Sequence, residues 1–142
     1  MSESAVANVQ QFSDAEIGDA VRKVVAESLG RKLDEVKIDS VLMGDLGAES
    51  LDFRDIVFRL ERDFGIEITR GEMERASRGD MSQDEFAPGG VISEAGLARL
   101  KELMPEASDR IKPGLRPSTI LTLFSVQTFA NMVIGKRDGR TV

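Results

Sequence analysis

A helical apolar period between Ser50 and Phe64 is the feature that most limits how this chain can fold. At about 100° per residue, one narrow stripe contains five apolar side chains: Phe53, Ile56, Val57, Leu60 and Phe64. Gly65 follows at once, and glycine commonly ends helices because it tolerates the left-handed conformation. We therefore predict a helix from about Ser50 to Phe64 with the apolar stripe in a core.

Three further helices are predicted from capping residues and apolar spacing, at Asp14–Leu29, Glu94–Leu103 and Val126–Ile134. Ser13 and Glu16 form a capping-box pattern before the first of these, while Ser93 and Ser125 precede the other two. No segment of useful length alternates polar and apolar residues as a strand would. The sequence therefore predicts an all-α fold.

The segments between these helices are expected to be less regular. Residues 31–47 resemble a long loop with occasional apolar anchors, and "TRGEMERASRGDMSQDEFAPGG" (69–90) is expected to hold at most short helical turns. We predict a flexible N-terminal tail (1–12), a single domain (13–135), and a flexible C-terminal tail (136–142). The loop at residues 31–47 is expected to be functional, because long loops inside small domains usually are.

Two missing residue types narrow the possible chemistry. The 142 residues include neither cysteine nor histidine, which removes thiolate nucleophiles, zinc–thiolate sites and histidine-based catalytic arrangements. The net charge of −6 makes nucleic acid an unfavourable partner. Neither a secretory signal nor a stretch of eighteen apolar residues is present. We therefore expect a cytoplasmic monomer that binds no nucleic acid and does not insert into membranes.

Ser50 follows Gly-Ala-Glu at the start of the most strongly patterned helix, and it can be interpreted in three ways. A nucleophile would need a base other than histidine, and the sequence lacks the G-x-S-x-G motif. A metal site built from Asp45, Glu49 and Asp52 does not match the calcium-loop spacing. A phosphodiester on Ser50 would instead be stabilised by the helix N-terminus. The residues thus favour a modified serine over a catalytic or metal site.

The string "DLGAESLDFRDIVFRLERDFGIEI" resembles the core of acyl carrier proteins, in which the serine of D-L-G-x-D-S-L carries 4′-phosphopantetheine. The terminal "FSVQTFANMV" resembles the last helix of that family, so the resemblance covers about 13–68 and 123–134. It implies an acyl-carrier-protein-like four-helix bundle with an extra helical insertion before the last helix. It also implies a non-catalytic carrier that holds acyl groups as thioesters.

The resemblance gives the motif residues their expected roles. Ser50 would be the attachment site, flanked by Asp45, Gly47, Glu49 and Leu51. The outer face of the helix would dock partners through five residues: Leu51, Arg54, Asp55, Phe58 and Arg62. The inner face would line an acyl-chain pocket with Phe53, Ile56, Val57 and Leu60. The implied partners are a phosphopantetheinyl transferase, an acyl-loading enzyme, and a ketosynthase or acyltransferase.

The chain departs from the family pattern at Glu49, where aspartate is usual, and at Arg54, Arg59 and Arg62, which lie in a typically acidic recognition helix. The connection between Ile68 and Leu123 is also longer than the family pattern, which implies an insertion at about 71–121 within the domain. These differences predict a specialised carrier for fatty acid, lipid or polyketide synthesis. Two alternatives are a peptidyl or aminoacyl carrier and an unmodified carrier-like adaptor that binds proteins.

Overall fold

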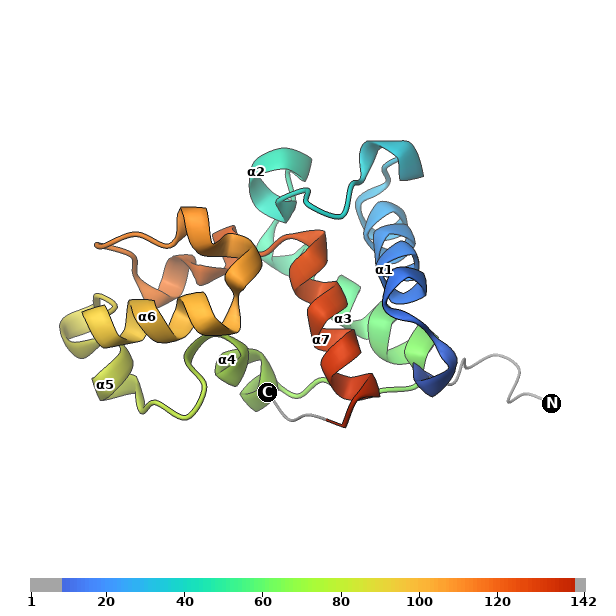
Figure 1. The fold of residues 1–142 in the computed structure, drawn as a ribbon. Helices are drawn as coiled ribbons and strands as arrows, with labels where there is room; N and C mark the ends of the chain where they lie inside the picture. The colour runs from blue at the N-terminus through green and yellow to red at the C-terminus, as the bar shows by residue number, and fades with distance from the viewer. Residues whose placement is uncertain (1–8, 140–142) are drawn as a thin grey trace.

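A computed structural model describes residues 9–139, and it consists of helices joined by short turns (Figure 1). The α-helices are α1 (Asp14–Leu29), α2 (Leu42–Leu46), α3 (Ser50–Phe64), α4 (Arg70–Arg78), α5 (Gln83–Phe86), α6 (Glu94–Leu103) and α7 (Val126–Arg137). Short 3₁₀ segments lie at η2 (Val9–Gln11), η3 (Leu33–Glu35), η4 (Pro88–Gly90), η5 (Pro105–Arg110) and η6 (Pro117–Leu123). Over the described residues there is no β-strand, only one antiparallel bridge between Val41 and Ser125. The predicted all-α fold is confirmed.

The predicted capping residues set the helix boundaries. The Ser13 hydroxyl accepts from the Glu16 N–H, the Glu16 carboxylate accepts from the Ser13 N–H, and Gly30 ends α1 at φ +66°. Gly65 ends α3 in the same left-handed conformation, at φ +65°. The structure places α1, α3 and α6 at their predicted bounds.

The prediction of only short turns in residues 69–90 was wrong, because α4 is a nine-residue helix. Thr69 and Glu72 cap it reciprocally: the Thr69 hydroxyl accepts from the Glu72 N–H, and the Glu72 carboxylate accepts from the Thr69 N–H. A second oxygen of Glu72 accepts from the Lys136 ammonium of α7. Tertiary contact thus helps to stabilise a segment that has few apolar residues of its own.

Several smaller departures concern the loop and the two predicted tails. The long loop contains α2, and α7 continues past Gly135 to Arg137. Val9 is buried and the Phe12 ring meets Phe64 edge to face at 5.3 Å, so residues 9–12 pack on the bundle. Arg137 holds both ends together, since its guanidinium lies 2.7 Å from Asp14 and donates to the Phe12 carbonyl. The remaining tail residues, 1–8 and 140–142, lie outside the described part of the chain.

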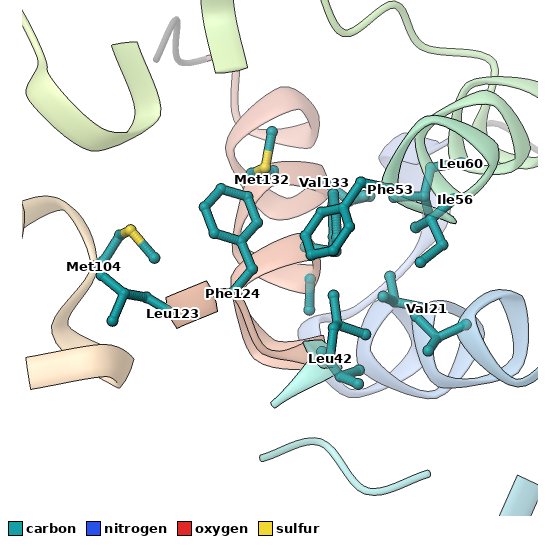
Figure 2. Packing of buried hydrophobic residues seen from close by; sticks show 14 of the residues in the cluster. Val21, Leu42, Phe53, Ile56, Leu60, Met104, Leu123, Phe124, Met132 and Val133 are labelled. Atoms are coloured by element: carbon teal, nitrogen blue, oxygen red, sulfur yellow. The ribbon is translucent and has the colours of Figure 1, made fainter. Parts of the chain in front are cut away.

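One connected apolar core extends from α1 through α3 and α7 to the elements that follow α5 (Figure 2). Phe53 of α3, Phe124 after η6 and Phe129 of α7 form a triangle of rings with centroids 5.6–5.9 Å apart. Ring pairs at this separation and tilt stabilise a core beyond their buried area. The segment before α7 therefore shares its packing with the bundle.

Backbone hydrogen bonds attach the long loop to the start of α7. The Leu42 N–H donates to the Phe124 carbonyl, the Val126 N–H to that of Ser40, and the Gln127 N–H to that of Ile38. These bonds fix the loop that leads into α2 and then into the N-terminus of α3. The position of Ser50 is therefore set by contacts with the opposite end of the chain.

The helices α5 and α6 pack closely at Gly96, on the side of α7 away from α1 (Figure 1). A Cβ atom on Gly96 would lie 2.5 Å from the Phe86 carbonyl oxygen and 2.8 Å from Ile92 Cγ2. Both distances are too short for real atoms, and one of them is to backbone. The glycine is therefore needed for this packing.

We expect Gly96→Ala to lower the free energy of unfolding by about 1–3 kcal/mol, the usual cost of overpacking, despite the better helix propensity of alanine. Gly135→Ala is the matched control, because a Cβ there meets no heavy atom within 4 Å. It should raise the stability by up to about 1 kcal/mol. Urea denaturation of both variants measures the difference, and a stabilised Gly96→Ala would contradict the packing argument.

Candidate functional site

Ser50 is the first residue of α3 and follows a tight turn from α2. Gly47 ends α2 at φ +71°, and the Ala48 N–H donates to the Leu42 carbonyl. Ala48 is buried, whereas Glu49 and Ser50 are exposed. Within residues 9–139 the Ser50 hydroxyl has no hydrogen-bond partner. The turn thus fixes the backbone before α3 and leaves the Ser50 hydroxyl exposed to solvent.

The acidic residues around Ser50 have structural roles. The Asp45 carboxylate accepts from the Val41 N–H at 2.8 Å, and the Asp52 carboxylate accepts from the Glu49 N–H at 2.7 Å. Both carboxylates therefore stabilise helix N-termini. In the described part of the chain, no group of three acidic, histidine or cysteine side chains is arranged to hold a metal ion.

The outer face of α3 presents two large apolar side chains. Leu51 is 74% exposed and Phe58 is 60% exposed, the two highest values among the large apolar residues described. Their i, i+7 spacing places them on the same side of the helix. A pair of exposed apolar side chains near Ser50 is consistent with the predicted docking surface.

Asp55 lies at the edge of this face and turns toward α1. Its carboxylate accepts from the Ser28 hydroxyl at 2.6 Å and from the Arg59 guanidinium at 2.8 Å. The Ser28 hydrogen bond, followed by that of Arg59, lowers the pKa of Asp55 below its usual value. Asp55 thus connects α3 to α1 as well as bordering the outer face.

The three arginines of α3 differ in their surroundings. Arg59 pairs with Asp55 and lies 3.9 Å from Glu27 of α1, while Arg62 pairs with the adjacent Asp63 at 2.8 Å. Arg54 is exposed, and no ion pair involves it in the described residues. Arg54 is therefore the arginine of this helix with the clearest opportunity to meet a partner.

The sequence around Ser50 is similar to sequences of known proteins. The family model described as "Phosphopantetheine attachment site" matches residues 19–83, which includes Ser50 and α3. An acyl carrier protein from Campylobacter hominis is 50% identical over 60 residues, which are 42% of this chain and 76% of that protein. The chain belongs to the acyl carrier protein family. No solved structure matches it with comparable significance.

Acyl carrier proteins carry covalently attached 4′-phosphopantetheine and interact with phosphopantetheinyl transferases and acyl-handling enzymes. The Ser50 hydroxyl fits this group, because it is exposed and without a partner among the described residues. It also lies where unpaired N–H groups and the dipole of a fifteen-residue helix stabilise a phosphodiester. No helix within residues 9–139 of this carrier is long and apolar enough to cross a membrane.

A cavity of about 740 Å³ lies beside α3 in this carrier. Of the four residues predicted to line an acyl-chain pocket, Phe53 and Val57 line this cavity. Ile56 and Leu60 do not, and both are fully buried in the core. The cavity therefore lies on one flank of α3 rather than along its whole inner stripe.

Ten of the fourteen residues that line the cavity were not among the site residues predicted from the sequence. Phe86, Pro117, Ile120 and Leu121 all follow the end of the family match at residue 83. We call residues 84–123 the additional segment. Its apolar run "ILTL" was visible in the sequence, but only the fold shows that Ile120 and Leu121 of this run line the cavity beside α3.

Proposed function

We propose that Ser50 carries the 4′-phosphopantetheine arm and that the protein holds acyl groups on it as thioesters, without catalysing their reactions. One observation carries the proposal: an exposed serine hydroxyl, with no partner among the described residues, begins α3 in a chain of this family. The N-terminus of α3 would stabilise the negative charge of the attached phosphodiester.

Loading would form a bond between Ser50 Oγ and the phosphorus of coenzyme A that bears the pantetheine group. The diphosphate bond would break, adenosine bisphosphate would leave, and the serine proton would pass to solvent or to a base of the transferase. The arm supplies the thiol that this cysteine-free chain lacks. A transferase, an acyl-loading enzyme, and a ketosynthase or acyltransferase are therefore the proposed partners.

The residues beside Ser50 would position the arm rather than react. Asp45 caps α2, and Gly47 allows the turn between α2 and α3. Glu49 and Leu51 are exposed on either side of the serine and would contact the transferase. Leu51 and Phe58 would then supply apolar contacts for later partners, with Arg54 and Arg62 contributing charge and Asp55 bordering the surface.

Intact mass after incubation with coenzyme A and a broad-specificity transferase tests this function. A gain equal to one phosphopantetheine is expected. An unchanged mass, obtained with an enzyme that loads an ordinary carrier in the same tube, would favour the protein-binding adaptor. The group carried on the arm in cells, read from the intact mass of the isolated protein, then distinguishes an acyl carrier of a specialised fatty acid, lipid or polyketide pathway from a peptidyl carrier.

We expect Arg54→Glu to increase elongation of the loaded protein severalfold by a ketosynthase that serves ordinary, acidic carriers. The reason is that Arg54 presents a positive charge to a partner surface that is itself basic. The gain should shrink at high salt, because the charge is exposed. Arg62→Glu is the comparison, in which a smaller gain is expected because this arginine already pairs with Asp63. Unchanged elongation in both variants would leave no role for these charges in specificity.

A further inference from the structure

Arg31 joins the end of α1 to the end of α2. Its backbone is fixed at α1, because Gly30 ends that helix in the left-handed conformation and the Arg31 N–H donates to the Ala26 carbonyl at 2.9 Å. Its guanidinium Nη2 donates to the Leu46 carbonyl at 3.0 Å. Leu46 is the last residue of α2, so this one hydrogen bond spans the whole connection between the two helices.

The carbonyl that Arg31 holds lies where the turn before Ser50 begins. It belongs to the peptide bond between Leu46 and Gly47, and Gly47 then reverses the chain at φ +71°. The last carbonyls of a helix have no partner within the helix, and a charged donor bonds such a group more strongly than a neutral one. The Leu46 side chain is buried, so its peptide group is anchored on both sides.

The other hydrogen bonds of this turn arise within α2 and α3. The Ala48 N–H donates to the Leu42 carbonyl at 2.9 Å, and the Glu49 N–H donates to the Asp52 carboxylate at 2.7 Å. Among the described residues, Arg31 is the one side chain from outside these two helices that bonds the backbone of residues 46–50. It therefore fixes the turn relative to the rest of the bundle.

We propose that Arg31 is a positioning residue for the loading of Ser50: it holds the Leu46–Gly47 peptide and so keeps the serine hydroxyl where the transferase needs it. This inference rests on the proposed function, because it concerns transfer of phosphopantetheine to Ser50 Oγ. Arg31 takes no part in the bond changes of that transfer. Misplacing a reacting atom by about 1 Å can slow a reaction about a hundredfold. A turn that samples other conformations would therefore load more slowly.

The alternative is that Arg31, an exposed residue, contacts the transferase directly. Positioning is favoured because the guanidinium already bonds a backbone carbonyl only four residues before Ser50. The two roles differ in kinetics. In single-turnover loading with the transferase in excess, positioning changes the maximal rate, whereas direct contact changes the transferase concentration that gives half of that rate.

We expect Arg31→Ala to lower the maximal rate of loading by about threefold to tenfold, the effect of losing one hydrogen bond of ordinary strength. Arg31→Lys should restore most of the rate, because its flexible ammonium can donate to the same carbonyl. Arg22→Ala is the matched control. The Arg22 guanidinium also donates to backbone carbonyls of the loop, those of Leu33 and Val36, but neither belongs to the turn. This variant should keep the parent rate.

Hydrogen exchange provides a readout that does not involve the transferase. Exchange of the Ala48 N–H reports how often the turn opens, because this group donates to the Leu42 carbonyl. Arg31→Ala should speed that exchange by about threefold to tenfold and leave the amides in the middle of α1 unchanged. Unchanged exchange at Ala48, or faster exchange throughout α1 as well, would overturn the positioning role.

Failure of the inference can be distinguished from failure of the proposed function. If the parent protein gains no mass, the proposed function fails, and the exchange rates still test the turn. If the parent and Arg31→Ala load at the same maximal rate, Ser50 is still the attachment site and only the role of Arg31 is wrong. An increase in the half-saturating transferase concentration alone would show direct contact and would also overturn positioning.

Discussion

Ser50→Ala should abolish the mass gain on incubation with coenzyme A and a transferase, a loss of at least a hundredfold in loading. The variant removes the oxygen to which phosphorus would be transferred, and alanine cannot replace it. Its fold should be unaffected, because the Ser50 hydroxyl has no partner in the described residues and Asp52 caps the Glu49 N–H instead. Circular dichroism should therefore match that of the parent protein.

Ser118→Ala is a suitable control for this experiment. Ser118 is an exposed serine in the first residues of a 3₁₀ helix, η6, at some distance from Ser50 in sequence. Its loss should leave loading intact. A Ser50→Ala protein that still gains one phosphopantetheine would move the attachment site elsewhere and remove the central residue of the proposed function.

Phe129→Ala should lower the free energy of unfolding by about 3–5 kcal/mol, the range found for deleting a fully buried aromatic ring. Phe129 is 0% exposed, and its ring contacts both Phe53 and Phe124. The substitution leaves a cavity where α3, α7 and the end of η6 meet. Chemical denaturation followed by circular dichroism measures the loss.

Phe58→Ala is the matched comparison for Phe129→Ala, because Phe58 is an exposed phenylalanine of α3. Phe58 is 60% exposed, so its truncation should change stability by less than about 0.5 kcal/mol. It should nevertheless slow acyl transfer if Phe58 contacts partner enzymes. A loss of about 3 kcal/mol for Phe58→Ala would identify it as a packing residue and contradict the docking surface.

The helices that could be predicted are those whose boundary signals lie within a few residues of their apolar stripe. Ser13 with Glu16 at the start of α1, and Gly65 at the end of α3, act through local hydrogen bonds and backbone conformation. Such effects can be inferred from sequence because the interacting groups are neighbours in the chain. The attachment motif at Ser50 was inferred instead from its resemblance to acyl carrier proteins, and the roles of its residues stay predictions.

The features that escaped prediction depend on contacts between distant residues. Thr69 and Glu72 match the T-x-x-E pattern, so a cap was visible, but α4 has few apolar residues and also bonds to Lys136 of α7. The part of the cavity wall formed by Ile120 and Leu121 depends on how the additional segment folds back onto α3. No local pattern specifies that return.

The contact between Glu72 and Lys136 bears on how such a carrier could arise in evolution. Burial opposes ionisation of Glu72, yet its hydrogen bonds from the Lys136 ammonium and the Thr69 N–H keep the pKa below its usual value. This ion pair joins α4 directly to α7, although residues 79–125 separate the two helices in sequence. Because closing a loop costs only about 0.6 kcal/mol more for each doubling of its length, an ancestor with a short connection could accept a much longer one at little cost in stability. Lengthening this one connection could then add a wall to the cavity beside α3, while α3 itself stayed unchanged.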